Sequence, residues 1–185
     1  NGFSRAWNTD IFDYASLYQA ADFGERNTEI QELFDKLETW DFEAIMRALL
    51  STQTVAEIYN FGEEVIEKVK EDQEVLKTAL LTAISSSHPE LPNDVQDEQY
   101  KSVREFLKRF KEIFTVNYDL LMYWARNRDI GPIWISDDGF RTDRWWFGHD
   151  TDQNIHFLHG GLHLYEELGG VRKHVYTREV GGGIV

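Results

Sequence analysis

Apolar residues recur three or four positions apart from the N-terminal part of the chain to about residue 110. This spacing is typical of helices that bury one face, because three to four residues make one helical turn. The expected buried stripes are Ile30, Leu33, Phe34 and Leu37; Phe42, Ile45, Met46 and Leu49; Ile58, Phe61, Val65 and Val69; Leu76, Leu80 and Ile84; and Val103, Phe106, Leu107 and Phe110. The sequence therefore predicts that the first two thirds of the chain are largely helical.

Polar residues with good capping side chains mark where several of these helices are expected to begin. Thr28 and Thr54 each stand three positions before a Gln or Glu, which is the pattern of a capping box. Asp41 is expected to start a further helix, since Asp is a preferred N-cap residue. The helical region that opens at Thr54 is expected to run to about Ser87, with a break near 72–73.

After about residue 110 the pattern changes to short runs of apolar and β-branched residues separated by turn signals. The run from Ile113 to Val116 predicts a short buried strand, and the apolar segment 120–125 after it predicts a helix. Further strand candidates are 133–135, 155–159 and 171–177. We expect an α/β fold with a Rossmann-like parallel sheet and a large helical portion, in one domain that spans residues 1–185.

Polar side chains stand where two of the predicted strands end. Asn117 and Asp119 follow the first strand, and His159 and Gly160 end the strand candidate at 155–159. In open α/β sheets, ligands bind at the carboxyl ends of the strands. These residues are therefore the first candidates for a binding site.

Composition narrows the classes of function. Six Trp, eight Tyr and twelve Phe supply enough apolar surface for a folded protein. The net charge of −14 argues against binding to nucleic acid or to anionic membranes, because phosphates would be repelled. The sequence has no cysteine and no apolar run near the length of a membrane helix, which fits a cytoplasmic protein.

Three segments together resemble the sirtuin-like superfamily of NAD-binding domains. They are Phe114–Asp119, with its Thr-x-Asn-x-Asp pattern, the later Leu158–Gly160, and the opening Asn1–Ser4. Their order and rough separation match an uncharacterised bacterial branch of that superfamily across nearly the whole chain. The resemblance implies a Rossmann-like fold of the sirtuin-like type and NAD as the ligand.

The resemblance also implies roles for individual residues. Thr115, Asn117 and Asp119 would meet His159 and Gly160 over the nicotinamide ribose. Asn117 would position the attacking water or the ribose, and Asp119 would bind the carboxamide or a hydroxyl and stabilise the developing cation. His159 would be the general base, since imidazole titrates near neutral pH.

Gly2, Phe3 and Ser4 resemble the trailing half of a Gly-x-Gly-x-Ser phosphate loop and would bind the diphosphate at a helix N-terminus. The first strand and first glycine of that loop are missing, and the chain begins without Met, so we expect a fragment of a longer protein. The four cysteines of the zinc ribbon of protein deacylases are also missing, which disfavours protein deacetylation. The implied function is hydrolysis of NAD to nicotinamide and ADP-ribose, as in bacterial antiphage defence, without a metal.

Structural explanations compete with each of these roles. Asp119 could cap the helix that follows it, Asn117 could be a turn residue, and His159 could be a structural histidine. As an alternative function, the same site could sense NAD or ADP-ribose without cleaving it. The helical region would then make contacts between copies of the chain.

A metal-dependent hydrolase is the remaining alternative. His156, His159 and His163, with His149 or Asp150, are the possible ligands. On a strand, however, His156 and His159 would point to opposite faces, because side chains alternate with a period of two. We therefore expect no metal site.

Overall fold

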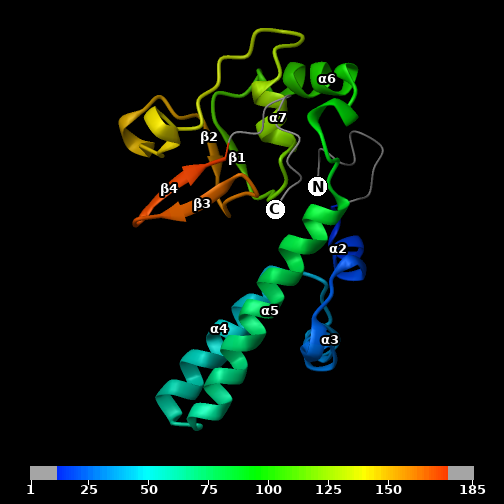
Figure 1. Cartoon of the computed structure of the whole chain (residues 1–185), viewed down its shortest axis with the longest axis vertical. Coiled ribbons are helices and arrows are strands. Elements are labelled where there is room, and N and C mark those ends of the chain that lie inside the picture. Colours follow the sequence, from blue (N-terminus) through cyan, green and yellow to red (C-terminus); the bar gives the residue numbers. More distant parts are fainter. Residues whose placement is uncertain (1–11, 175–185) are drawn as a thin grey trace. The chain divides into compact units, whose positions relative to one another are not determined.

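The computed structural model describes residues 12–174, which fall into two compact units, 12–87 and 88–174. Figure 1 shows the order of the elements along the chain. The helices of the described range are α2 (Tyr14–Ala20), α3 (Asn27–Lys36), α4 (Phe42–Tyr59), α5 (Glu63–Ser87), α6 (Asp97–Leu107) and α7 (Leu121–Asn127), with 3₁₀ turns at Gly24–Arg26, Pro92–Asp94, Thr142–Arg144 and Gly148–Asp150. The strands are β1 (Ile113–Thr115), β2 (Ile155–Phe157), β3 (Leu164–Glu167) and β4 (Gly170–Lys173). The fold is thus mixed α/β, and a single domain over residues 1–185 stays a prediction.

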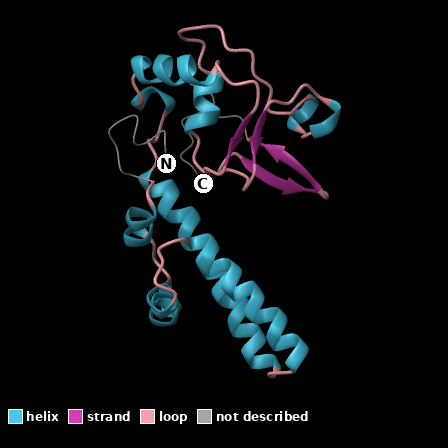
Figure 2. Cartoon of the chain, turned by 180° about the vertical axis from the view of Figure 1, so that it is seen from behind, coloured by secondary structure: helices cyan, strands magenta, loops and turns pink. Residues whose placement is uncertain are grey.

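The helices α4 and α5 form a long hairpin in the first unit (Figures 1 and 2). Asp41 caps the start of α4, because its carboxylate accepts the backbone N–H of Glu43 at 2.8 Å and of Ala44 at 3.4 Å. The helix ends at Tyr59, and the next residue, Asn60, has a left-handed φ of 53° and ψ of 51°, as is common after a helix. The predicted start at Asp41 is confirmed.

Both predicted capping boxes are wrong. The helix α3 begins two residues earlier than the Thr28 box requires, since it continues directly from the preceding 3₁₀ turn. Thr54 lies inside α4, where its hydroxyl donates to the carbonyl of Leu50 at 3.0 Å. A Ser or Thr side chain can bond within a helix as well as cap one, so the spacing alone does not mark a start.

The expected break near 72–73 is also wrong, because α5 is continuous through these residues. Asp72 faces the interior and is buried. Arg26 donates to both of its carboxylate oxygens, at 2.7 and 3.1 Å. The buried charge of Asp72 is thus paired with an arginine from a distant part of the same unit.

Two isoleucines of α4 allow a test of which face of this helix is buried. Ile45 is 0% exposed and Ile58 is 69% exposed. We predict that Ile45→Ala lowers the free energy of unfolding by about 2–5 kcal/mol, because the cavity cannot refill. Ile58→Ala, the matched control, should change it by less than about 0.5 kcal/mol. Urea denaturation of both variants checks this, and equal losses would contradict the assigned faces.

In the second unit, β1 and β2 pair in parallel, with Ile113 opposite Ile155 and Thr115 opposite Phe157. Both isoleucines are buried, and the segment 120–125 that begins α7 is buried throughout. A separate hairpin pairs β3 with β4 through Leu168 and Gly169, both at positive φ as a tight two-residue turn requires. The strands at 113–115 and 155–157 confirm those parts of the sequence prediction.

The strand expected at 133–135 is wrong. Ile133 and Ile135 project outward, 88% and 87% exposed, while only Trp134 between them is buried. The guanidinium of Arg104 lies 5.8 Å from the Trp134 ring centre and donates to the carbonyl of Pro132 at 3.2 Å. The buried Trp134 and the Arg104 contact at Pro132 thus anchor this segment, which carries no strand. Among the helices of residues 12–174, none combines the length and hydropathy needed to cross a bilayer.

Candidate functional site

The parallel pairing of β1 and β2 brings their carboxyl ends to one edge. Backbone contact continues past the strands, because the N–H of Leu158 donates to Thr115 at 2.9 Å and that of Leu162 donates to Tyr118 at 2.8 Å. The rings of Tyr118 and His159 lie 6.0 Å apart between centres. The segments 116–119 and 158–162, far apart in sequence, are therefore neighbours in space.

The side chains after β1 are tied into the local backbone. Thr115 is buried, and its hydroxyl accepts the N–H of Asn117 at 3.1 Å. Asp119 is buried too, and its carboxylate accepts the N–H of Leu121 in the first turn of α7 at 2.9 Å. Asp119 thus holds the start of the helix, as the capping interpretation predicts.

His88 completes the start of α7 and was not anticipated from the sequence. Its Nε2 accepts the N–H of Leu120 at 2.9 Å, and its Nδ1 lies 2.8 Å from the carbonyl of Pro89, so Nδ1 carries the proton. The ring packs edge-on against Trp124. Burial lowers the pKa of His88 to about 4, so the imidazole is neutral at pH 7.

The residues after β2 differ in exposure and in the space around them. His159 is exposed, whereas Asp119, which follows β1, is buried. Gly160 has a φ of +77°, and a Cβ there would meet no atom within 4 Å. A Cβ on Gly161, by contrast, would lie 3.1 Å from the His163 ring. Gly160 therefore leaves open space at this edge, whereas Gly161 allows close packing beneath it.

His163 forms part of the interior below this edge. It is fully buried, stacked on Tyr123 with 4.6 Å between ring centres and edge-on to Phe157 at 4.7 Å. Burial is the main cause that lowers its pKa to about 3. Neither ring nitrogen has a hydrogen-bond partner among residues 12–174.

Two pockets lie near the predicted residues. Thr115 and Asn117 line one of about 360 Å³, together with Phe106, Phe114 and Met122. Gly160 lines another, of about 510 Å³, on the side of β2 and the β3–β4 hairpin. The expected phosphate-loop residues Gly2, Phe3 and Ser4 lie outside the described residues.

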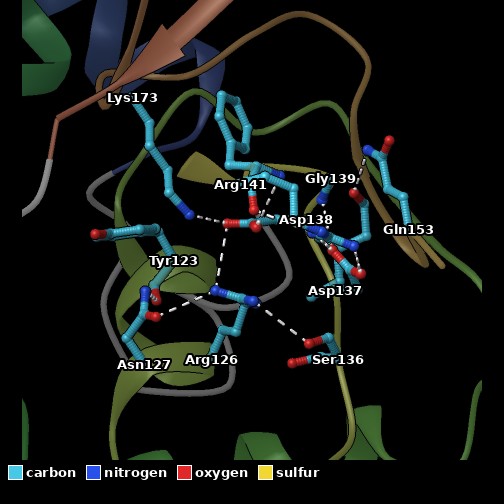
Figure 3. A network of polar contacts seen from close by, with 12 residues as sticks. Tyr123, Arg126, Asn127, Ser136, Asp137, Asp138, Gly139, Arg141, Gln153 and Lys173 are labelled. Carbon is cyan, nitrogen blue, oxygen red and sulfur yellow. Dashed lines mark hydrogen bonds and ion pairs between the residues drawn. The ribbon is translucent and has the colours of Figure 1, made fainter. Parts of the chain in front are cut away.

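A buried ion network behind the site was also missed by the sequence reasoning (Figure 3). Asp138 is 1% exposed, and it accepts a hydrogen bond from Lys173 of β4 at 2.7 Å. The guanidinium of Arg126, in the last turn of α7, lies 3.3 Å from the same carboxylate. The network connects α7, the loop after residue 135 and β4, so it fixes the elements that surround the β1–β2 edge.

Comparison with known proteins gives one match. Residues 1–182 match the model of a family described as "Domain of unknown function (DUF4917)". No curated protein and no solved structure matches the chain. Within residues 12–174, no three His, Asp or Glu side chains are grouped so that they could hold a metal ion.

The neutral His88 predicts a loss of stability in acid. Its folded-state pKa of about 4 lies below the ordinary value of 6.5, so the unfolded chain binds the proton first as the pH falls. Stability should drop by up to about 3 kcal/mol between pH 6.5 and pH 4 from this group. Urea unfolding of the wild type and His88→Asn at both pH values measures it.

The variant should be less stable than the wild type at pH 7, by about 1–3 kcal/mol, because the Leu120 N–H loses its acceptor. The difference should narrow toward pH 4, because protonation of His88 in the unfolded chain lowers the stability of the wild type only. Two pH profiles that run parallel would contradict the role given to His88.

Proposed function

Because the chain belongs to the DUF4917 family, whose description names no activity, we propose its function from the site itself: the chain binds NAD and hydrolyses it to nicotinamide and ADP-ribose. The observation that carries this proposal is the pairing of β1 with β2, which places Asn117 to Asp119 beside His159 and Gly160. We further propose that these strands are neighbours in a Rossmann-like sheet of the sirtuin-like type.

The shape of the strand ends supports a ligand at this edge. Ligands of open parallel sheets bind beyond the carboxyl ends of neighbouring strands. Gly160 has no atom within 4 Å of where its side chain would start, so its backbone is accessible to a ligand. In the proposal, Thr115 lies at the base of the ribose site, and Gly2, Phe3 and Ser4 hold the diphosphate.

Hydrolysis breaks the bond between the ribose C1 and the pyridinium nitrogen. The electron pair of that bond leaves with nicotinamide, which becomes neutral, and C1 passes through an oxocarbenium-like state. The carboxylate of Asp119 stabilises that positive charge, since its contact with the Leu121 N–H fixes it in place before reaction. Asn117 orients water toward C1, and the exposed imidazole of His159 accepts the proton that water loses.

A binding module that senses NAD or ADP-ribose is the second candidate. Two observations favour it: the Asp119 carboxylate is engaged at the start of α7, and Asn117 and Gly160 line different pockets. A sensor needs only a site whose conformation changes when the ligand binds. Unlike a hydrolase, it does not need a water oriented toward the ribose C1. Calorimetry with NAD, followed by analysis of the ligand, separates the two functions, because a sensor returns NAD intact.

The base assignment predicts the effect of His159→Ala. Nicotinamide release from NAD should fall by about 10²–10⁴-fold, which is the usual contribution of a general base. Arg109→Ala is the control, since this exposed side chain lines neither of the two pockets. Release measured by chromatography should stay near wild type in the control. An unchanged rate in His159→Ala would reject the assignment.

Asp119→Asn separates electrostatic stabilisation from capping. The amide oxygen keeps an acceptor for the Leu121 N–H, so the melting temperature should change little. The rate of nicotinamide release should nevertheless fall by about 10²-fold, because the negative charge near C1 is lost. Thermal melts and turnover assays on the same sample test this. Full activity in Asp119→Asn would assign the residue to capping alone.

A further inference from the structure

A second feature of this unit is the pocket of about 510 Å³ beside β2. Its size is in the range of pockets that hold small organic ligands. Aromatic and aliphatic side chains make up most of its lining: Phe140, Trp146, Phe157, Leu158, Leu164, Tyr165 and Val171. The lining also holds the polar side chains of Asp138, Gln153, His156 and Glu166, so it suits a ring that carries a polar or charged group.

Trp146 forms a rigid wall of this pocket while remaining 43% exposed. Its indole N–H donates to Gln153 at 3.0 Å, and Gln153 in turn donates to the carbonyl of Ile155 in β2 at 2.8 Å. Gly139 and Gly148 lie against the ring so closely that a Cβ would come within 2.8 and 2.5 Å of it.

This clamping fixes the orientation of Trp146 without burying it. A large apolar side chain that is ordered yet accessible offers contact area to a ligand at little cost in conformational entropy. The wall is therefore organised before any ligand arrives.

One charged side chain on the pocket lining is available to a ligand. Asp138 is one of the lining residues, and Lys173 and Arg126 offset its charge. Glu166 lines the pocket, is exposed, and forms no ion pair within residues 12–174. Aromatic faces such as that of Trp146 add to the attraction, since they bind cations.

We propose that this pocket binds a planar, positively charged nitrogen heterocycle of the pyridinium type, with the ring against Trp146 and the charge toward Glu166. NAD carries such a ring in its nicotinamide, and Gly160 connects the pocket to the β1–β2 edge. The identification of that ring with nicotinamide rests on the proposed function; the binding of a pyridinium does not.

The test titrates two probes into the full chain: nicotinamide methylated on its ring nitrogen, and uncharged nicotinamide. The six indole N–H signals are followed by NMR, with the Trp146 signal identified through Trp146→Phe. The Trp146 signal should shift, and the charged probe should bind about fivefold more tightly than the neutral one.

Glu166→Gln should remove that preference, whereas Glu90→Gln, which deletes an exposed charge that does not line the pocket, should keep it. Equal affinity for both probes in the wild type, an unmoved Trp146 signal, or a preference that survives Glu166→Gln would overturn the inference. Nicotinamide release from NAD is assayed on the same samples. Pyridinium binding without nicotinamide release would reject the proposed hydrolysis and support the assignment of the pocket. Nicotinamide release without a shift of the Trp146 signal would support the hydrolysis and reject the assignment of the pocket.

Discussion

The site depends on the parallel pairing of β1 and β2, only three residue pairs long. Such short strands are stable because their inward side chains, Ile113 and Ile155, are buried together with the start of α7. Backbone contacts from Leu158 and Leu162 extend the pairing beyond the strands. A shift in register of one residue would turn the buried side chains outward and separate the two strand ends.

The start of α7 shows how the fold couples structure to the proposed chemistry. Its first N–H groups are accepted by the imidazole of His88 and the carboxylate of Asp119, which both lie at the edge where the strands end. A buried carboxylate that caps a helix is already oriented and needs no rearrangement to stabilise a cation. Capping and catalysis are therefore compatible roles for Asp119. Capping needs only an oxygen acceptor, whereas the catalytic role also needs the negative charge of the carboxylate.

The sequence predicted the features that local patterns determine. Apolar runs located the strands at 113 and 155, helical spacing indicated a largely helical first part, and Asp41 marked the start of α4. The expected buried stripe from Ile58 to Val69 was wrong, because it runs across the end of α4 and three of its four side chains are exposed. The neighbourhood of segments 116–119 and 158–162 followed from placing both after predicted strands. Local pattern misled where a polar or apolar residue has a distant partner, as Asp72 has in Arg26 and Pro132 has in Arg104. The ion pair of Asp138 with Lys173, 35 residues apart, leaves no local signal.

The central claim is that one ligand contacts both strand ends at once. NMR titration of NAD, followed at the backbone amides of Asn117 and Gly160, tests it most directly. The two amides should shift together and give one dissociation constant, the same as calorimetry gives. If NAD binds and either amide stays unmoved, or if the two report different constants, the strand ends do not form a common site.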